Sequence, residues 1–511
     1  MIPDALPILS LLIGLPFAAG LSMVFVPKPE TGRMLALAAA VLELLLAAML
    51  LWGFDPVDPG LQFVERHAWI PSLNAHYQLG VDGVSVLFPF LGAVLNLAVI
   101  VASWTVVQNR VRLYYGMILA LGGATVGVFC ATDLMLFFLF WELTIVPVYV
   151  LAGFSGIGPQ RRYAAVKYAL FMLAGGIPLL FAILLLALNH ARFLGVPAPA
   201  GLSFDYLALL DTPLGGSLAT AVFLLLVLGF AVKAPLFPFH GWLPTLAMEG
   251  PAGLTAWLAG LKLGAFGIVR FAVPLSPQAA LEYRGLMAGV GILTAAYGAI
   301  VAMRQTNLRR LLAFSSISHV GLVVAGIAAL NFQALQGALF QLANFSIVAG
   351  GLFMVAGFIQ HRTGSTEIDQ LGGLAKPMPL LGALFFVLGL ASLGVPGTSG
   401  FAAEHLILIG LLRQHTGLGL AALFAGIVAA AYVLRYFRRA FLGPDKLGTA
   451  PGELDLRPRE LLVAGALVLW VVVLGLFPRL ALDLSDGAVS ALLARVHESL
   501  PEGPTSVAVA E

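Results

Sequence analysis

The chain has 511 residues, of which 60% are hydrophobic and 10% charged, and its mean hydropathy is +0.98. Soluble domains carry about 25% charged residues, so this composition excludes an ordinary soluble protein. The net charge of +2 gives no sign of a nucleic-acid partner, and a single cysteine, Cys130, excludes a disulfide framework. The sequence also lacks the glycine motifs that bind nucleotides. These features predict an all-α polytopic membrane protein.

Apolar runs of roughly 20 residues, separated by Gly, Pro and charged residues, predict about fourteen transmembrane helices. The predicted ranges are 5–26, 33–53, 82–104, 113–131, 133–153, 163–187, 217–239, 252–274, 283–302, 311–330, 333–358, 377–411, 418–441 and 460–481. The first range has no basic leader or clear cleavage site and is predicted to be a retained helix.

The even number of helices places both chain ends on the same side of the membrane. Lysines and arginines gather in the loops after odd-numbered helices, as at Arg161, Arg309 and Arg438. Because positive loops stay on the cytoplasmic side, both termini are predicted to be extracytoplasmic.

Two of the predicted helices are expected to be broken. Residues 377–411 are too long for a hydrocarbon core of about 30 Å, and they contain SLGVPGTSG at 392–400, with Pro396 and Gly397 at its centre. In the seventh helix, Pro235 and Pro238 leave the carbonyls of nearby residues without helical donors. Unwound backbone at membrane depth indicates a hydrated interior, and two such breaks are typical of inverted-repeat transporters.

Five ionisable side chains fall deep inside the predicted helices. They are Glu142, Lys233, Lys262, His319 and Glu404. A charge at the bilayer centre costs about 2.5–3.5 kcal/mol on insertion scales, so such residues usually serve a function. Any one could be a structural ion pair or a core histidine, but acidic and basic groups recurring near one depth favour a proton path. Separating a buried Glu–Lys pair changes the proton affinity of both groups, as a proton relay requires.

Further ionisable residues are weaker candidates for a secondary proton path. These are His240, Lys167, His405 and Glu249. Lys167 equally fits a side chain that snorkels to the interface, and His240 equally fits a loop hydrogen bond. Arg270, near a helix end, is expected to snorkel. Glu43 has no partner that the sequence identifies, and no role is assigned to it.

Four stretches carry a family resemblance: FFLFWELTIVPVYVLAG (137–153), VKAPLFPFHGWLP (232–244), QTNLRRLLAFSSISHVGLV (305–323) and GVPGTSGFAAEHLIL (394–408). They resemble the antiporter-like M subunits of bacterial NADH:quinone oxidoreductase, respiratory complex I, over about residues 80–440. The resemblance implies fourteen helices, with inverted five-helix repeats at helices four to eight and nine to thirteen and breaks in helices seven and twelve.

The resemblance also implies the division of the chain and the roles of its residues. The expected parts are 1–110 (helices one to three), 111–275 and 276–442 (the two repeats), and 443–511 (helix fourteen and an extracytoplasmic tail). Glu142 and Lys233 are expected to pair, Lys262 and His319 to continue the path, and Glu404 to form its exit side. Quinone reduction in other subunits would supply the energy, in the bacterial cytoplasmic membrane.

The resemblance implies no cofactor and no catalytic centre in this chain. FMN, iron–sulfur clusters and quinone are expected in partner subunits, and neighbouring antiporter-like subunits are the expected partners. The chain would thus be a non-redox subunit of a proton-translocating oxidoreductase.

The sequence departs from the family pattern at several positions. Thr245 and Ala247 replace an Asp and a His, Asn307 stands where Asp is usual, and Phe345 replaces the histidine of helix eleven. These departures leave room for a subunit of a related complex: a sodium/proton antiporter, a membrane-bound hydrogenase or an inorganic-carbon uptake system. Two buried lysines disfavour a sodium cage, and a purely structural scaffold leaves the costly buried charges unexplained.

Overall fold

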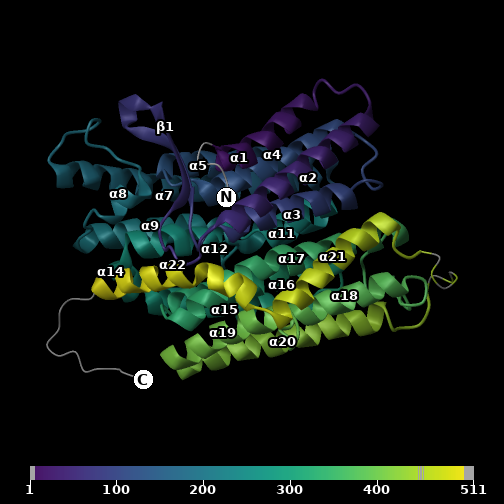
Figure 1. The fold of residues 1–511 in the computed structure, drawn as a ribbon. Helices are drawn as coiled ribbons and strands as arrows, with labels where there is room; N and C mark the ends of the chain where they lie inside the picture. The colour runs from purple at the N-terminus through teal and green to yellow at the C-terminus, as the bar shows by residue number, and fades with distance from the viewer. Residues whose placement is uncertain (1–5, 447, 449, 451, 453, 500–511) are drawn as a thin grey trace.

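The computed structural model describes residues 6–446, 448, 450, 452 and 454–499, and its long helices run side by side (Figure 1). Among these residues, eleven helices are long and apolar enough to cross a membrane. Three shorter apolar helices, Ile8–Ser22, Leu87–Ala102 and Pro379–Ser392, fall in the remaining predicted ranges. The predicted helical membrane architecture is therefore confirmed, whereas the exact number of fourteen spans stays a prediction.

The elements follow in chain order. They are α1 (Ile8–Ser22), α2 (Pro29–Gly53), β1 (Gln62–Ile70), η1 (Pro71–Leu73), β2 (Ala75–Val81), α3 (Leu87–Ala102), α4 (Val111–Cys130), α5 (Leu134–Leu143), α6 (Ile145–Ser155), α7 (Arg161–Leu194), α8 (Tyr206–Leu210), α9 (Gly216–Lys233), η2 (Phe239–Gly241), α10 (Trp242–Glu249), α11 (Ala252–Gly260), α12 (Leu263–Gly267), the π-helix η3 (Ile268–Ala272), α13 (Val273–Leu275), α14 (Pro277–Glu282), α15 (Arg284–Arg304), α16 (Leu308–Ala328), α17 (Phe332–Thr363), α18 (Pro379–Ser392), α19 (Ser399–Gln414), α20 (Thr416–Ala440), α21 (Pro458–Leu476) and α22 (Arg479–Glu498).

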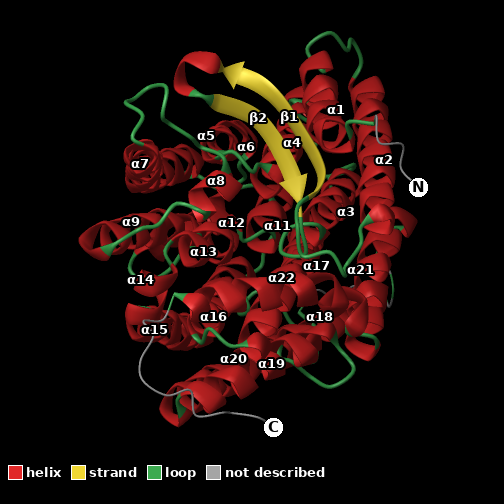
Figure 2. Cartoon of the chain, turned by 60° about the vertical axis from the view of Figure 1, so that its left-hand side comes forward, coloured by secondary structure: helices red, strands yellow, loops and turns green. Residues whose placement is uncertain are grey.

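Helix α16 lies at the centre of the bundle and is buried throughout the part that could cross a membrane. Helix α17 and the segment α11–α13 are nearly as buried, whereas α2 and α21 are mostly exposed at the periphery. Figure 2 shows α16, α17, α11 and α12 surrounded by the other helices. Polar side chains on the central helices are therefore shielded from lipid by the peripheral helices.

Small residues allow α15 and α16 to pack with their backbones in close contact. A Cβ on Gly298 would lie 2.6 Å from the backbone nitrogen of Ser318, where no side chain can fit. The close approach lets the hydroxyl of Ser318 donate to the Ala295 carbonyl at 2.8 Å. Within lipid, where the hydrophobic effect does not hold helices together, such close contacts stabilise the bundle. They also fix the position of His319, the next residue on α16.

The two predicted helix breaks are present. Helix α9 ends at Lys233, and α18 and α19 are separated by residues 393–398. Gly397, with φ +86°, adopts a left-handed conformation that a side chain would strain. One detail differs from expectation: the Ala231 carbonyl accepts a hydrogen bond from the Leu236 backbone at 3.0 Å, so it is not left without a donor.

Two further breaks were not predicted. The predicted fifth helix is divided at Thr144 into α5 and α6, and the predicted eighth helix is interrupted at Leu261–Lys262 between α11 and α12. Pro147 could have indicated the first of these breaks. The second lies in LAGLKLGAFG, where three glycines lower helix propensity but no proline marks the site.

The predicted loop 54–80 contains an antiparallel hairpin, β1–β2, which contacts α1, α4 and α5 (Figure 2). Asp133 joins this hairpin to the helices, because its carboxylate accepts hydrogen bonds from the backbone of His76 in β2 and of Met135 and Leu136 in α5. Asp133 is thus the N-cap of α5.

The region beyond the last predicted helix also differs from expectation. Residues 479–498 form the amphipathic helix α22 rather than a tail, and α22 packs on α17, α13 and α14. Gln336 donates to Asp486, and Arg495 donates to the Pro274 carbonyl at 3.0 Å, so the middle and the C-terminal end of α22 are bound to the bundle. The rest of the predicted tail, 500–511, lies outside the described residues.

Candidate functional site

Four of the five main candidate residues lie at or near a helix break. Glu142 is two residues before the α5–α6 junction, Lys233 ends α9, and Lys262 lies between α11 and α12. Glu404 lies in the second turn of α19, directly after the 393–398 break. The fifth, His319, lies within the continuous central helix α16. Backbone groups released at a break become available to the charged side chains beside it.

Lys233 is buried, and its ammonium group is held by the α5–α6 junction. Its Nζ donates to the Trp141 carbonyl at 2.8 Å and to the Thr144 hydroxyl at 2.8 Å. Nζ also lies 3.9 Å from the centre of the Trp141 ring, a cation–π contact. Lys233 is therefore bound to the α5–α6 junction next to Glu142, through a backbone carbonyl and a hydroxyl rather than through the Glu142 carboxylate.

Glu142 is half-buried, and its carboxylate lies against α7. A Cβ on Gly176 would be 2.3 Å from Oε1 of Glu142, so the absence of a side chain at residue 176 makes room for the carboxylate. This oxygen has no hydrogen-bond partner among the described residues. The expected Glu142–Lys233 pair is thus not a direct contact in this structure, because the lysine binds Trp141 and Thr144 instead.

Lys262 is buried at the centre of the bundle and donates to the hydroxyl of Ser316 on α16. Its Nζ lies 5.6 Å from the centre of the Phe345 ring. Ser316 and Phe345 also line a small cavity together with His319, and this cavity offers about 20 Å³ to the centres of water molecules. Since about 10–15 Å³ suffices for one water, a water-mediated step from Lys262 towards His319 is sterically feasible.

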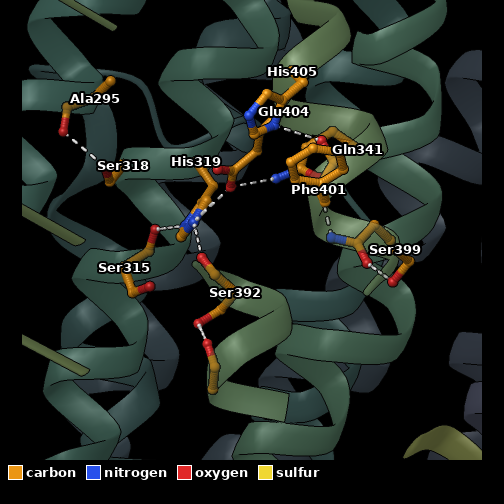
Figure 3. Close-up of polar contacts among 12 residues, drawn as sticks. Ala295, Ser315, Ser318, His319, Gln341, Ser392, Ser399, Phe401, Glu404 and His405 are labelled. Atoms are coloured by element: carbon orange, nitrogen blue, oxygen red, sulfur yellow. Dashed lines mark hydrogen bonds and ion pairs between the residues drawn. The ribbon is translucent and has the colours of Figure 1, made fainter. Parts of the chain in front are cut away.

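His319 is held by backbone carbonyls on two helices (Figure 3). Nδ1 lies 2.7 Å from the Ser315 carbonyl, and Nε2 lies 2.9 Å from the Ser392 carbonyl at the end of α18. Nε2 also lies 3.4 Å from Oε1 of Glu404. Carbonyl oxygens only accept, so both contacts are hydrogen bonds when each ring nitrogen carries a proton. The resulting imidazolium faces a carboxylate, which is a favourable buried pair.

A chain of uncharged polar side chains continues from Glu404 (Figure 3). Gln341 donates to Oε1 of Glu404 at 3.3 Å, Asn344 donates to Gln341 at 3.1 Å, and the Ser399 hydroxyl donates to Asn344 at 2.5 Å. On the other side of His319, Tyr432 donates to the Ser315 hydroxyl at 2.8 Å. This cluster thus connects α16, α17, α19 and α20.

Phe345 occupies the gap between Lys262 and His319. Its ring centre lies 5.6 Å from the ammonium of Lys262 and 5.6 Å from the imidazole centre of His319. An aromatic ring stabilises a nearby cation but cannot carry a proton at neutral pH. The replacement of a histidine at this position therefore leaves Ser316 and the adjacent cavity as the polar connection.

The secondary candidates lie apart from this series. Lys167 donates to the Thr245 hydroxyl at 3.0 Å, and His240 lies 3.2 Å from the Tyr297 hydroxyl through Nε2. Glu249 accepts a hydrogen bond from the backbone of Gln160, the residue directly before α7. His405 is exposed on α19, and its Nδ1 contacts the carbonyl of its own helix at Phe401. The structure does not bring these residues into contact with the main series.

One sequence expectation outside the series is wrong. Arg270 does not snorkel: it lies in the π-helix η3, is buried, forms an ion pair with Asp82 and stacks over Tyr206. Glu43, for which the sequence identified no partner, is fully buried and accepts a hydrogen bond from Asn96 at 2.7 Å. Asp82 and Asn96 were missed because Asp82 lies at the very start of its predicted helix and Asn96 carries no charge to draw attention to it within the apolar run.

The polar residues that sequence reasoning missed share a simple signal. Ser315, Gln341, Asn344 and Ser399 are uncharged polar residues inside apolar helices, and all line the His319–Glu404 cluster. Among the described residues, no three His, Cys, Asp or Glu side chains are placed to hold a metal ion.

Comparisons with known proteins agree with this geometry. Residues 131–429 match the model of the family described as NADH:quinone oxidoreductase/Mrp antiporter, TM. NAD(P)H-quinone oxidoreductase chain 4 1 of Synechococcus sp. (strain JA-3-3Ab) is 38% identical over 507 residues, covering 97% of this chain and 94% of that protein. NADH-quinone oxidoreductase subunit M of Rhodobacter capsulatus is 35% identical over 507 residues, covering 96% and 98%.

A solved structure supports the same conclusion. A chain of respiratory complex I from Thermus thermophilus with bound NADH superposes with a TM-score of 0.86 and 32% identity, covering 96% of this chain and 99% of that one. The predicted resemblance is confirmed by sequence and by fold. This chain belongs to the NADH:quinone oxidoreductase/Mrp antiporter family of membrane proteins.

Proposed function

We propose that this chain is a proton-translocating, non-redox membrane subunit of a respiratory NADH:quinone oxidoreductase. Protons move through Glu142, Lys233, Lys262, His319 and Glu404 and the water between them. The observation that carries this proposal is the buried His319–Glu404 pair, which lies beside a helix break and, with its hydrogen-bond partners Ser392 and Gln341, links helices α16, α17, α18 and α19. Ionisable side chains buried at membrane depth are costly to keep and usually serve a function.

The redox chemistry is assigned to other subunits. An iron–sulfur cluster generally needs four cysteine ligands, and Cys130 is the single cysteine of the chain. We therefore assign FMN, iron–sulfur clusters and quinone to partner subunits, and quinone reduction there drives the proton movement. Neighbouring antiporter-like subunits in the bacterial cytoplasmic membrane are the proposed partners, with both termini of this chain extracytoplasmic.

Each repeat would contribute part of the path. The first repeat (111–275) holds Glu142, Lys233 and Lys262, and the second (276–442) holds His319 and Glu404. The interruptions beside Lys233 and Glu404 occupy comparable positions in the two proposed repeats, which supports inverted-repeat architecture.

The test uses the intact complex in liposomes, with NADH:quinone turnover and proton uptake measured together. Lys233→Ala and Glu142→Ala are each expected to lower proton uptake while the complex still assembles. Lys376→Ala is the matched control, because Lys376 is an exposed lysine paired with Asp445. Normal proton uptake in both Lys233→Ala and Glu142→Ala would contradict the proposal.

The same liposomes test the alternative, an ion-translocating subunit of a related sodium/proton-exchanging complex. The family description includes Mrp antiporters, which makes this the natural competitor. Two lysines in the buried series disfavour a sodium site, because Na⁺ requires oxygen ligands. Proton uptake is expected to be equal in sodium-free and sodium-containing buffer, and a strict sodium requirement would favour the alternative.

A further inference from the structure

A second small cavity lies beside Lys233 and is separate from the cavity at His319. It offers about 30 Å³ to the centres of water molecules, and Lys233, Thr144, Tyr168 and Trp257 are among its lining residues. This is room for one or two waters. Leu261 and Leu263, the neighbours of Lys262, line the same cavity, so it extends from Lys233 towards the break in α11–α12.

Two buried polar groups on the wall of this cavity have no hydrogen-bond partner among the described residues. They are the hydroxyl of Tyr168 and Nε1 of Trp257, whose side chains are 1% and 3% exposed. A buried polar group without a partner costs about 1–3 kcal/mol. Two such groups on one cavity indicate that a molecule within it completes their hydrogen bonds.

The ammonium of Lys233, which lines the same cavity, has one N–H left to donate to a water there. A lysine carries three N–H donors, and Trp141 and Thr144 accept two of them. A water needs two to four polar partners to be held in a protein interior. Lys233, Trp257 and Tyr168 together provide three: two donors to the water oxygen and one hydroxyl that accepts from it.

We infer that this cavity binds an ordered water against Lys233, and that Tyr168 and Trp257 hold the water in place for proton exchange with the lysine. The water accepts a proton from the Lys233 ammonium, which becomes a neutral amine, and gives one of its own protons to a second water in the cavity on the side of the α11–α12 break, so the first water ends neutral and the positive charge moves with the proton. Tyr168 and Trp257 are positioning residues in this scheme. The inference rests on the proposed function, because it concerns a proton step at Lys233.

The first test is high-resolution cryo-electron microscopy of the intact complex. Water density is expected within hydrogen-bonding distance of Lys233 Nζ, and it should be lost in the Tyr168→Phe/Trp257→Phe double variant. An empty cavity in the unmodified complex, in a map that resolves other buried waters, would overturn the inference.

The second test measures proton uptake and its solvent isotope effect in liposomes. The double variant removes both polar contacts, and Tyr168→Phe alone keeps the ring shape, so both are measured; uptake in the double variant is expected to slow about five- to tenfold, as for about 1 kcal/mol of lost hydrogen bonding. Its H₂O/D₂O rate ratio is expected to rise, which a purely structural defect would not cause. Tyr436→Phe is the control, because the Tyr436 hydroxyl is bound to Thr366 and faces neither cavity.

The two proposals fail in different ways. If Lys233→Ala abolishes uptake but the double variant behaves like Tyr436→Phe, the water site is refuted and the proton path stands. If Lys233→Ala and Glu142→Ala both pump normally, the proposed function fails, and a proton step through water at Lys233 is refuted with it.

Discussion

The absence of a side chain at Gly176 fixes where the Glu142 carboxylate lies, and adding one methyl group there tests whether that place matters. In Gly176→Ala the new Cβ would be 2.3 Å from Oε1, whereas ordinary contacts begin at 3.4 Å. The carboxylate must therefore retreat by roughly 1 Å, the difference between these distances. The contact is with the end of a flexible side chain rather than with backbone, so α7 and α5 can stay in place.

A displacement of 1 Å is large for a group that transfers protons. A misplacement of this size at a reacting group can cost about 100-fold in rate. We therefore expect Gly176→Ala to assemble normally and to lose most of its proton uptake in liposomes, approaching Glu142→Ala. Gly289→Ala serves as the control, because a Cβ at residue 289 meets no atom within 4 Å. Full proton uptake in Gly176→Ala, together with a defect in Glu142→Ala, would refute the view that the position of the carboxylate matters.

Other substitutions test the remaining contacts. Arg270→Met leaves the carboxylate of Asp82 buried without its partner, so the subunit should lose about 3–5 kcal/mol of stability in denaturant titration of the purified complex. Adding Asp82→Asn to Arg270→Met should restore part of this stability. Equal stability in the unmodified protein, the single variant and the double variant would show that the pair contributes nothing. Glu404→Gln removes the charge that faces His319 while keeping the side-chain shape, so proton uptake should fall with assembly unchanged, and undiminished uptake would exclude Glu404 from the path. Asp133→Ala removes the N-cap of α5, which should cost about 1 kcal/mol and speed limited proteolysis of the β1–β2 hairpin; an unchanged cleavage rate would contradict this anchoring role.

The positions of the buried charges were predictable because each one interrupts a long apolar run. Glu142, Lys262 and His319 could be recognised from the sequence because a charge at that depth is costly. Their partners could not be recognised in the same way. Arg270 and Asp82 are 188 residues apart in the chain, and nothing local to Arg270 indicates that η3 turns it away from the interface. Periodicity predicts which residues share a helix face, but not which face meets which neighbour.

The helix breaks were predictable only where proline or a cluster of glycines causes them. The interruption at Pro235 and the one at Pro396 follow from the missing N–H of proline. The three glycines around Lys262 lower helix propensity but are spread over eight residues and do not mark where the helix is interrupted. There the Gly264 backbone lies against α9, where a Cβ would come 2.3 Å from the Ala234 nitrogen, so helix packing rather than local propensity determines the geometry. Tertiary packing of this kind leaves no signal in a single sequence.

Three buried side chains that can carry a positive charge contact carbonyl oxygens at or next to helix ends, whereas Lys262 binds a hydroxyl and Arg270 a carboxylate. Lys233 binds the carbonyl of Trp141 near the end of α5, and His319 contacts that of Ser392, the last residue of α18. Arg309, outside the proton series, likewise donates to Gly250, which follows α10. These carbonyls lack helical donors and together carry about half a negative charge at each helix end.

A broken helix therefore does more than admit water. The α5–α6 and α18–α19 breaks each leave a helix end inside the bundle, and a carbonyl at that end contacts Lys233 or His319. For Lys233 this contact takes the place of a direct carboxylate partner. A lysine held by carbonyl dipoles keeps a stable site in both its charged and neutral forms, whereas a tight ion pair would favour the charged form alone. The arrangement explains why Lys233 binds Trp141 rather than Glu142 at rest. It leaves Oε1 of Glu142 without a hydrogen-bond partner among the described residues. Approach of this carboxylate to Lys233 can then change the proton affinity of the lysine.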